Sequence, residues 1–285
     1  MKQPNKKTMK KIHVWVRAVI QLLYFLFIPS AYTAAFNGVK YIFTQMGAKT
    51  HLEVTSFVAA LIVLCVYTIV FGRFFCGFAC AFGSLGDAVR ALYVFICKKL
   101  KKKPITMKAT VVKKLQVVKY FVLAIIAVTC FTGVYSKAKG FSPWDVFSML
   151  HARNFKLGGY TLGVVLLVLI VIGMCFQERF FCRVLCPMGA VFSVLPVLPF
   201  STLRRDRSEC IKGCRACTMK CPSDIELAPD TAPELSGDCF QCQKCVDTCP
   251  RGNVHCGIKA LKGNEIVFTL VKAAILLGLC LLLGI

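Results

Sequence analysis

The sequence predicts a helical integral membrane protein that carries a small, cysteine-rich α+β domain near its C-terminal end. The first observation is composition: 57% of the 285 residues are hydrophobic and the mean hydropathy is +0.67. A soluble domain of this length is more polar, so the apolar excess is expected to face lipid. The second is the arrangement of the 18 cysteines in short CxxC and CxxxC runs. Such spacing is typical of metal sites rather than of a secreted disulfide framework.

The apolar residues form five stretches long enough to cross a membrane. A hydrocarbon core of about 30 Å needs roughly 20 helical residues. The stretches lie near residues 14–36, 54–71, 117–135, 157–176 and 266–285. We therefore expect about five spans, the last of them a C-terminal anchor, with Lys272 reaching toward the interface from within it.

The distribution of lysine predicts the orientation of these spans. The formal net charge is +23, and lysines cluster in the N-terminal arm and again between residues 98 and 114. Cations beside apolar spans mark the cytoplasmic side, which is a better explanation of the charge than a nucleic-acid partner. The expected protein is multi-pass in the cell (cytoplasmic) membrane, surrounded by membrane lipid. Its N terminus and the segment 177–265 would be cytoplasmic, and its C terminus would be outside.

An internal repeat organises the first 200 residues, the expected membrane domain. The pattern RFFCxxxC, followed by a glycine, occupies residues 73–83 and returns at residues 179–189 with an offset of 106. Two crossings separate the copies, so both lie on the cytoplasmic side, as in folds built from two parallel two-span repeats. The apolar segments 85–96 and 191–200 that follow are too short to span, and we interpret them as interfacial or re-entrant.

The repeated cysteines form a candidate metal centre. Cysteines at positions i and i+4 share one helical face, so the two copies would bring four thiolates together. The predicted ligands of this third centre are Cys76, Cys80, Cys182 and Cys186. Arg73 and Arg179 would offset its negative charge. Two other interpretations stay open at this stage, small interfacial residues or a reversible thiol pair.

The domain expected at residues 201–262 holds two further cysteine runs, each closed by Cys-Pro. The second run is C-x2-C-x2-C-x3-C-P without deviation, the ferredoxin pattern in which the fourth cysteine of each run ligates the other [4Fe–4S] cluster. The first run has one extra residue between Cys210 and Cys214. The predicted sets are Cys210, Cys214, Cys217 and Cys249 for one cluster, and Cys239, Cys242, Cys245 and Cys221 for the other. Zinc also accepts four cysteines, but paired Cys-Pro runs favour iron and sulfide.

No motif for substrate chemistry accompanies these cysteines. The chain has no CxxCH for covalent haem, no GxGxxG ahead of a helix, and no nucleophile beside a base. Cys256 has no place in the ferredoxin pattern and is expected to be a buried thiol. We therefore expect no catalytic residue, and a component of an oxidoreductase system rather than a stand-alone enzyme.

Several of these segments resemble the NapH/NosR-type membrane polyferredoxins. The resemblance lies in the second repeat with Cys186-Pro187, in Arg204-Arg205-Asp206, in Ser142-Pro143-Trp144-Asp145 and in the two ferredoxin runs. The chain departs from the pattern at Ala81, where the family has proline. The resemblance implies electron transfer between a cytoplasmic or quinone donor and a membrane or extracytoplasmic redox partner. A flavin would have to be carried by that partner. The alternative function is redox sensing, or the assembly and maturation of another metalloenzyme.

Overall fold

A computed structural model describes residues 6–136, 139–156, 158–199, 202–228, 231–257 and 265–285. The expected limits of the cysteine-rich domain, residues 201 and 262, lie outside the described residues. The membrane part contains α1 (Lys6–Phe27), α2 (Ala31–Ala48), α3 (Ser56–Phe71), α4 (Ala81–Lys99), α5 (Ala109–Leu115), α6 (Val118–Phe131), α7 (Pro143–His151), α8 (Thr161–Phe176), α9 (Pro187–Val194) and α12 (Glu265–Leu282).

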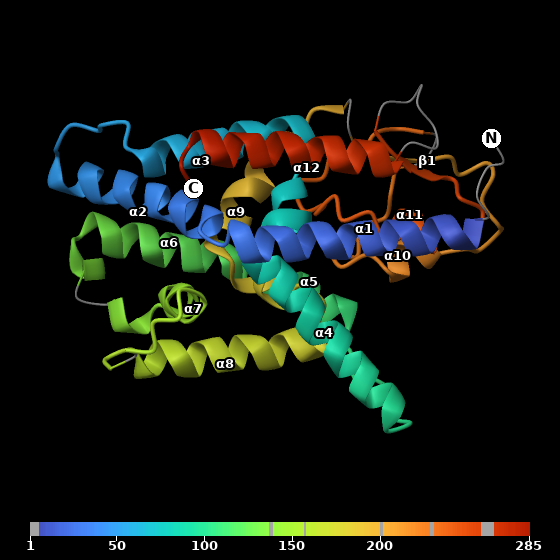
Figure 1. Ribbon diagram of the computed structural model, residues 1–285, viewed down its shortest axis with the longest axis horizontal. Coiled ribbons are helices and arrows are strands. Elements are labelled where there is room, and N and C mark those ends of the chain that lie inside the picture. Colours follow the sequence, from blue (N-terminus) through green and yellow to red (C-terminus); the bar gives the residue numbers. More distant parts are fainter. Residues whose placement is uncertain (1–5, 137–138, 157, 200–201, 229–230, 258–264) are drawn as a thin grey trace.

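The helices run mainly along the long axis of the molecule. Figure 1 shows α1 and α2 end to end, with α3 and α12 on one side of them and α6 and α8 on the other. Contacts between α2 and α3, between α2 and α6, and between α3 and α12 hold this bundle together. Helix α4 leaves the bundle obliquely, and its lysine-rich end points toward the same end of the molecule as α10 and α11.

Judged by helix length, fewer of the described helices can cross a membrane than the five expected. In the described part of the chain, two helices are long and apolar enough to cross a membrane alone, Ala109–Phe131 and Glu265–Leu282. The pair α1 and α2 would give a third, and α3 and α8 are apolar but have only 16 residues each. The five-span arrangement therefore stays a prediction.

The first expected span, residues 14–36, is not a single straight helix. Helices α1 and α2 are bent by 60° relative to each other at a short break that contains Pro29. A proline lacks the backbone N–H and its ring clashes with the preceding turn, so a helix ends there. Lys272 also departs from expectation. Its side chain is buried, with Nζ 3.7 Å from the Sγ atom of Cys256, instead of reaching the interface.

The internal repeat is visible in the backbone. A single π-helical turn follows α3 at Phe75–Ala79 and follows α8 at Phe181–Leu185, and α4 and α9 begin directly after these turns. The two cysteines of each copy therefore do not share one α-helical face, because the second one is the extended residue before the next helix. Pro187 begins α9, a position that suits proline. Ala81 begins α4, so this helix forms without the proline.

Aromatic rings fill the space between the two copies. Phe82 of the first copy stacks on Phe181 of the second with ring centroids 4.5 Å apart, and Phe74 stacks on Phe78 at 4.3 Å. These four rings are buried. Lipid tails are as apolar as these rings, so their contact stabilises the bundle through close van der Waals packing.

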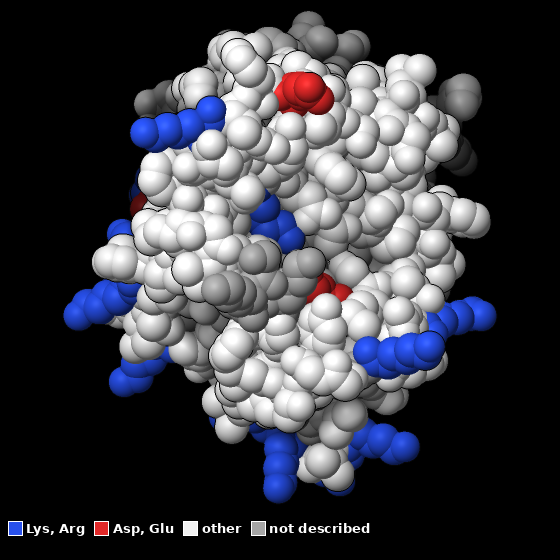
Figure 2. All heavy atoms as spheres, turned by 90° about the vertical axis from the view of Figure 1, so that its left-hand side faces the viewer, with Lys and Arg blue, Asp and Glu red and all other residues white. Residues whose placement is uncertain are grey.

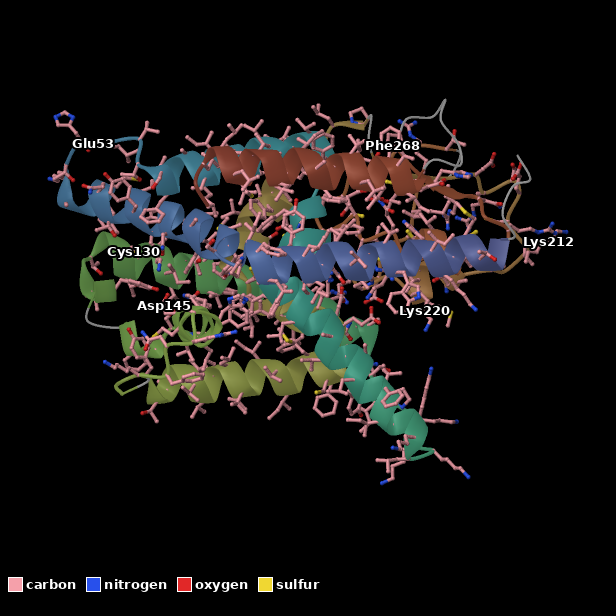
Figure 3. The ribbon with its side chains drawn as sticks, in the orientation of Figure 1. Glu53, Cys130, Asp145, Lys212, Lys220 and Phe268 are labelled. Carbon is pink, nitrogen blue, oxygen red and sulfur yellow. The ribbon has the colours of Figure 1, made fainter. Side chains whose placement is uncertain are left out.

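The cysteine-rich domain is small and lies at one end of the long axis. It contains β1 (Leu203–Arg205), α10 (Ala216–Met219), α11 (Lys244–Thr248) and β2 (Val254–Cys256), and β1 and β2 pair antiparallel. Figure 3 shows Lys212 and Lys220 of this domain at one end of the molecule, and Glu53 and Asp145 at the other.

Candidate iron–sulfur sites

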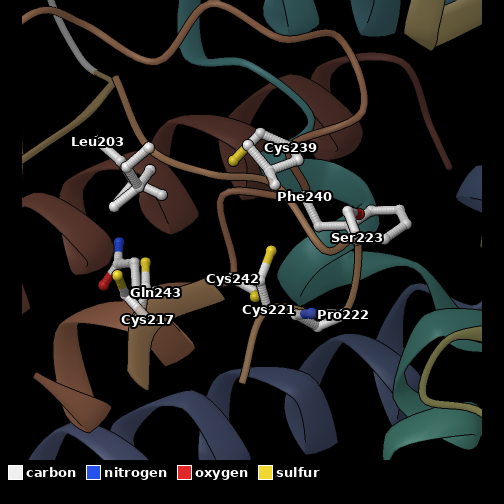
Figure 4. A pocket seen from close by; sticks show the side chains of 12 residues that line it. Leu203, Cys217, Cys221, Pro222, Ser223, Cys239, Phe240, Cys242 and Gln243 are labelled. Atoms are coloured by element: carbon white, nitrogen blue, oxygen red, sulfur yellow. The ribbon is translucent and has the colours of Figure 1, made fainter. Parts of the chain in front are cut away.

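A cavity inside the cysteine-rich domain brings together cysteines from both ferredoxin runs. Its volume is about 20 Å³, and it is lined mainly by apolar side chains and by five cysteines (Figure 4). The cysteines are Cys217, Cys221, Cys239, Cys242 and Cys245. Four of them are the set proposed for the second cluster, and Cys221 comes from the other run. Two-cluster ferredoxins exchange the fourth ligand in this way, and Cys217, from the set predicted for the other cluster, also lines the cavity.

The thiols of this cavity are close enough to affect one another's ionisation. Burial, together with the neighbouring Cys242, raises the pKa of Cys221 to about 11. Burial also raises the pKa of Cys239 and of Cys245 well above the ordinary value, and in both cases Cys242 adds to the effect. Crowded thiolates repel each other, so they ionise together only around a cationic group.

Zinc and an iron–sulfide cluster require different spacings of four cysteine ligands. Thiolates on one zinc lie about 2.3 Å from the metal, and therefore close to each other. Across the residues that the structure describes, no three His, Cys, Asp or Glu side chains are near enough to hold one metal ion. An iron–sulfide cube keeps its ligands farther apart, because the core lies between them.

The first set of ferredoxin cysteines also combines the two runs. The backbone N–H of Asn253 donates to Cys249 Sγ at 3.3 Å, and Asn253 Nδ2 lies 3.9 Å from Cys210 Sγ. Arg205 Nη1 donates to Cys217 Sγ at 3.4 Å. The extra residue of this run is accommodated by a turn in which Gly213 has a φ of +74°, a conformation that favours glycine.

The four repeated cysteines form another buried group in the membrane part. Cys76, Cys80, Cys182 and Cys186 are all less than 6% exposed, and Cys182 interacts electrostatically with the other three. Tyr32 of α2 is buried beside them, with its hydroxyl 3.9 Å from Cys186 Sγ. The two π-helical turns therefore bring together the ligands that the repeat predicts.

The arginine of each repeat lies against the other repeat. A Cβ added at Gly83 would lie 3.1 Å from Arg179 Nη1, and one added at Gly189 would lie 3.1 Å from Arg73 Nη2. Arg179 also donates to the carbonyl oxygens of Cys76 and Gly77. The symmetric positions of the two cations match the symmetric positions of the cysteines.

Arg73 gives a direct test of whether a cofactor fits here. Its side chain is 1% exposed, and within the described residues its Nε and Nη2 atoms have no hydrogen-bond partner. Its Nη1 atom pairs with Asp238 at 3.6 Å, but a buried N–H group without an acceptor is costly. A dicationic [4Fe–4S] core bound by four thiolates is a dianion, and two guanidinium groups would neutralise it. The residues present therefore fit an iron–sulfur centre.

Comparisons with known proteins agree with this chemistry. A family model described as a 4Fe-4S binding domain matches residues 54–104 and 160–198, which contain both repeats. An uncharacterized protein of Methanocaldococcus jannaschii is 32% identical over 191 residues, 67% of each chain. The ferredoxin-type protein NapH of Haemophilus influenzae is 25% identical over 71% of this chain and 68% of its own length. The regulatory protein NosR of Pseudomonas aeruginosa is 25% identical over 62% of this chain but only 24% of its own. No solved structure matches.

The chain belongs to the NapH/NosR-type family of membrane ferredoxin-type proteins. Relatives in this family include ferredoxin-type and electron-transport proteins, and in this chain the matched 4Fe-4S binding domain covers both cysteine repeats. The matched repeats are the part of this NapH/NosR-type protein that holds the buried group of four cysteines.

Buried polar contacts join the ferredoxin domain of this NapH/NosR-type protein to its membrane part. His13 and Arg17 of α1 both bind Asp247, and Arg17 also donates to the carbonyl oxygen of Cys242 at 3.1 Å. Lys119 of α6 pairs with Asp238 at 2.7 Å. Sequence reasoning missed these roles. The available signal was the presence of charged residues within otherwise apolar stretches, which usually have a partner there.

A further junction centres on Lys244, directly beside a predicted cluster ligand. Its Nζ atom lies 3.2 Å from Asp87 and 2.9 Å from Glu178. Burial alone would lower the pKa of Lys244, but these two carboxylates hold it above its ordinary value. Asp87 also pairs with Arg179 at 2.6 Å. One carboxylate thus joins the ferredoxin domain to the second repeat.

Proposed function

We propose that this protein is a membrane-bound electron-transfer subunit with three iron–sulfur centres. Two [4Fe–4S] clusters lie in the ferredoxin domain, and the third centre is held by Cys76, Cys80, Cys182 and Cys186. The subunit passes electrons between a cytoplasmic or quinone donor and a membrane or extracytoplasmic redox partner. The observation that carries the proposal is the direct packing of the ferredoxin cysteines on the repeats that hold the other four.

The third centre draws support from its surroundings. Four buried thiols, two symmetric arginines and a tyrosine hydroxyl converge on one dry position in the protein. Once bound there, an iron–sulfur centre supplies one-electron redox chemistry. The protein's own residues would ligate it, neutralise its charge through Arg73 and Arg179, and keep water away.

A groove between α1 and α4 is our candidate site for a quinone. Its volume is about 610 Å³, and its lining is mainly apolar, with Gln21, Ser84 and Asp87 among the polar residues. Gln21 Nε2 donates to the carbonyl oxygen of Gly77 at 3.1 Å and to Asp87 at 2.9 Å. The groove therefore reaches the turn that carries Cys76. An apolar tail and a polar head suit such a site, and a flavin carried by a partner is the alternative acceptor.

We place the ferredoxin domain and the N terminus on the cytoplasmic side, and the loop between α2 and α3 outside. The lysines at residues 98–103 follow α4 toward the ferredoxin end, as the positive-inside rule requires. Figure 2 shows the opposite end. Uncharged atoms cover most of its surface, and lysine and arginine side chains project mainly at its edge.

The test is anaerobic purification followed by iron and sulfide analysis and EPR. Replacing Cys76 and Cys182 by Ser should lower the iron content and remove one EPR signal, while the ferredoxin signals stay. The matched control replaces Cys65 and Cys175, which lie in the helices before the two repeats and have no assigned role. Unchanged iron with unchanged electron transfer would make the repeat a structural feature. Unchanged iron with lost transfer would indicate thiol chemistry.

The alternative function is redox sensing or the maturation of another metalloenzyme. A deletion mutant that lacks only one mature metalloenzyme, while membrane electron transfer continues, would favour it. The buried contacts between the ferredoxin domain and the repeats favour electron transfer instead, since a sensor does not require its clusters to lie against a further centre.

A further inference from the structure

We infer that the cluster site formed by Cys221, Cys239, Cys242 and Cys245 is the one that exchanges electrons with the membrane centre, and that its junction is the backbone contact between Gly77 and the segment 240–242. The inference rests on the proposed membrane centre, and adds an order to the three centres and a place for their contact. Neither the sequence pattern nor the matched family model specifies that order.

The first observation is the close approach at Gly77. A Cβ at this position would lie 2.3 Å from the carbonyl oxygen of Phe240 and 3.5 Å from the backbone nitrogen of Cys242. Gly77 directly follows Cys76 in the π-helical turn. A ligand of the membrane centre and a ligand of the ferredoxin cluster are therefore joined by backbones in direct contact.

The second observation comes from the other repeat. The residue equivalent to Gly77, at the offset of 106, is Arg183. Its Nη1 atom donates to the carbonyl oxygen of Pro222 at 2.7 Å, and its Nη2 atom pairs with Asp224 at 2.9 Å. Pro222 follows Cys221, so each repeat holds a different ligand loop of the same cluster site.

The third observation is the position of Phe240. Its ring lies 4.7 Å from the guanidinium carbon of Arg73 and 5.4 Å from that of Arg179, and it also lines the ferredoxin cavity. A cation placed over an aromatic ring is attracted to the face of that ring. The two arginines that face the membrane centre thus also fix the segment that carries Cys239 and Cys242.

The other ferredoxin site lies farther out. Cys210 bonds to the carbonyl oxygen of Asp206 and contacts Asn253, both within its own domain. Lys212, between Cys210 and Cys214, lies at the far end of the molecule (Figure 3). The order is therefore cytoplasmic partner, the Cys210 site, the Cys239 site and the membrane centre. Each step moves one electron from a reduced centre to an oxidised one, with no bond made or broken and no proton required.

The test measures electron arrival at the membrane centre in the full-length protein. The oxidised protein is mixed with dithionite, and the reduction of each centre is followed by freeze-quench EPR. In Gly77→Ala the Phe240 oxygen must move about 1.1 Å, from 2.3 Å to an ordinary contact of 3.4 Å. Because tunnelling decays exponentially with distance, we expect several-fold slower reduction of the membrane centre, with unchanged iron content.

Gly86→Ala is the matched control, because the nearest atom to its added Cβ is at 3.6 Å, an ordinary contact. Phe240→Leu is the second variant; it keeps an apolar side chain but loses the contact with both arginines, and it should also slow this step. The reduction of the Cys210 site should keep its rate in all three variants.

The outcomes separate the two proposals. Three centres in the wild type and an unchanged rate in Gly77→Ala and Phe240→Leu would overturn the junction and leave the proposed function standing. A wild type without a third centre would overturn both. If Gly77→Ala loses iron, the test rests on Phe240→Leu. An unchanged rate of reduction of the membrane centre in Phe240→Leu then overturns the junction.

Discussion

Asp87→Asn is the variant that most directly tests how the ferredoxin domain is attached. The Asp87 carboxylate pairs with Arg179 at 2.6 Å and with Lys244 at 3.2 Å, and accepts from Gln21 at 2.9 Å. Arg179 is fully buried, and the Asp87 side chain is only 13% exposed. An amide keeps the shape but removes the charge, which leaves Arg179 without its carboxylate.

The expected loss of stability follows from this burial. Removing one partner of a buried ion pair typically costs about 3–5 kcal/mol, because the remaining charge is not compensated. For a protein of this size each kcal/mol lowers the unfolding midpoint by about 2–4 °C, so the midpoint should fall by roughly 6–20 °C. Glu178→Gln is the control. It removes the other partner of Lys244, but Glu178 is 37% exposed, and such pairs contribute about 0–1 kcal/mol.

The assay is thermal unfolding in detergent under anaerobic conditions, with limited proteolysis of the segment after Thr202 as a second measurement. Asp87→Asn should unfold at a lower temperature, and the protease should cut its ferredoxin domain faster. Glu178→Gln should behave like the wild type in both measurements. Equal midpoints for both variants would refute the role we assign to Asp87, and with it the argument that this carboxylate joins the domain to the second repeat.

Three further predictions concern the clusters and the topology. The predicted ligand sets cross between runs, so Cys221→Ser should weaken the EPR signal of the Cys239 cluster more than that of the Cys210 cluster, and the reverse order would contradict the assignment. A reporter at Lys101 should be cytoplasmic and one after Ile285 external. An internal C-terminal reporter would mean that α12 does not cross. Removing iron with a chelator should make the ferredoxin domain sensitive to protease, since cluster binding and folding are coupled; equal digestion of both forms would show that the domain folds without iron.

The two cysteine sets remain predictions, and they rest on local information in the sequence. Short spacings and Cys-Pro endings define each run, and the exchange of Cys221 and Cys249 is a general property of such pairs. The internal repeat could also be recognised in the sequence, because its offset of 106 is constant along the motif. The π-helical turns were not, because an i, i+4 spacing is compatible with an ordinary helix, and only tertiary packing selects the wider turn.

The attachment of the ferredoxin domain could not be predicted, because it depends on pairs that are from 39 to 234 residues apart in the sequence. Nothing near His13 in the sequence indicates that it binds Asp247, and nothing near Gly77 indicates Phe240. The bend after Ile28 is an intermediate case. Pro29 marks a break in the helix, but whether a break divides one span or separates two elements is decided by the neighbouring helices.

The positions at which the two repeats differ explain how the ferredoxin domain is attached to them. Both copies have the two cysteines, the arginine that reaches the other copy, and the glycine that this arginine approaches. The position that faces the ferredoxin domain differs, with Gly77 in one copy and Arg183 in the other. A centre shared by both copies requires the same chemistry from each of them. The single ferredoxin domain, in contrast, contacts each copy with a different segment of its own chain. One copy therefore needs the smallest residue to allow backbone contact, and the other needs a long cation to reach the loop of Cys221.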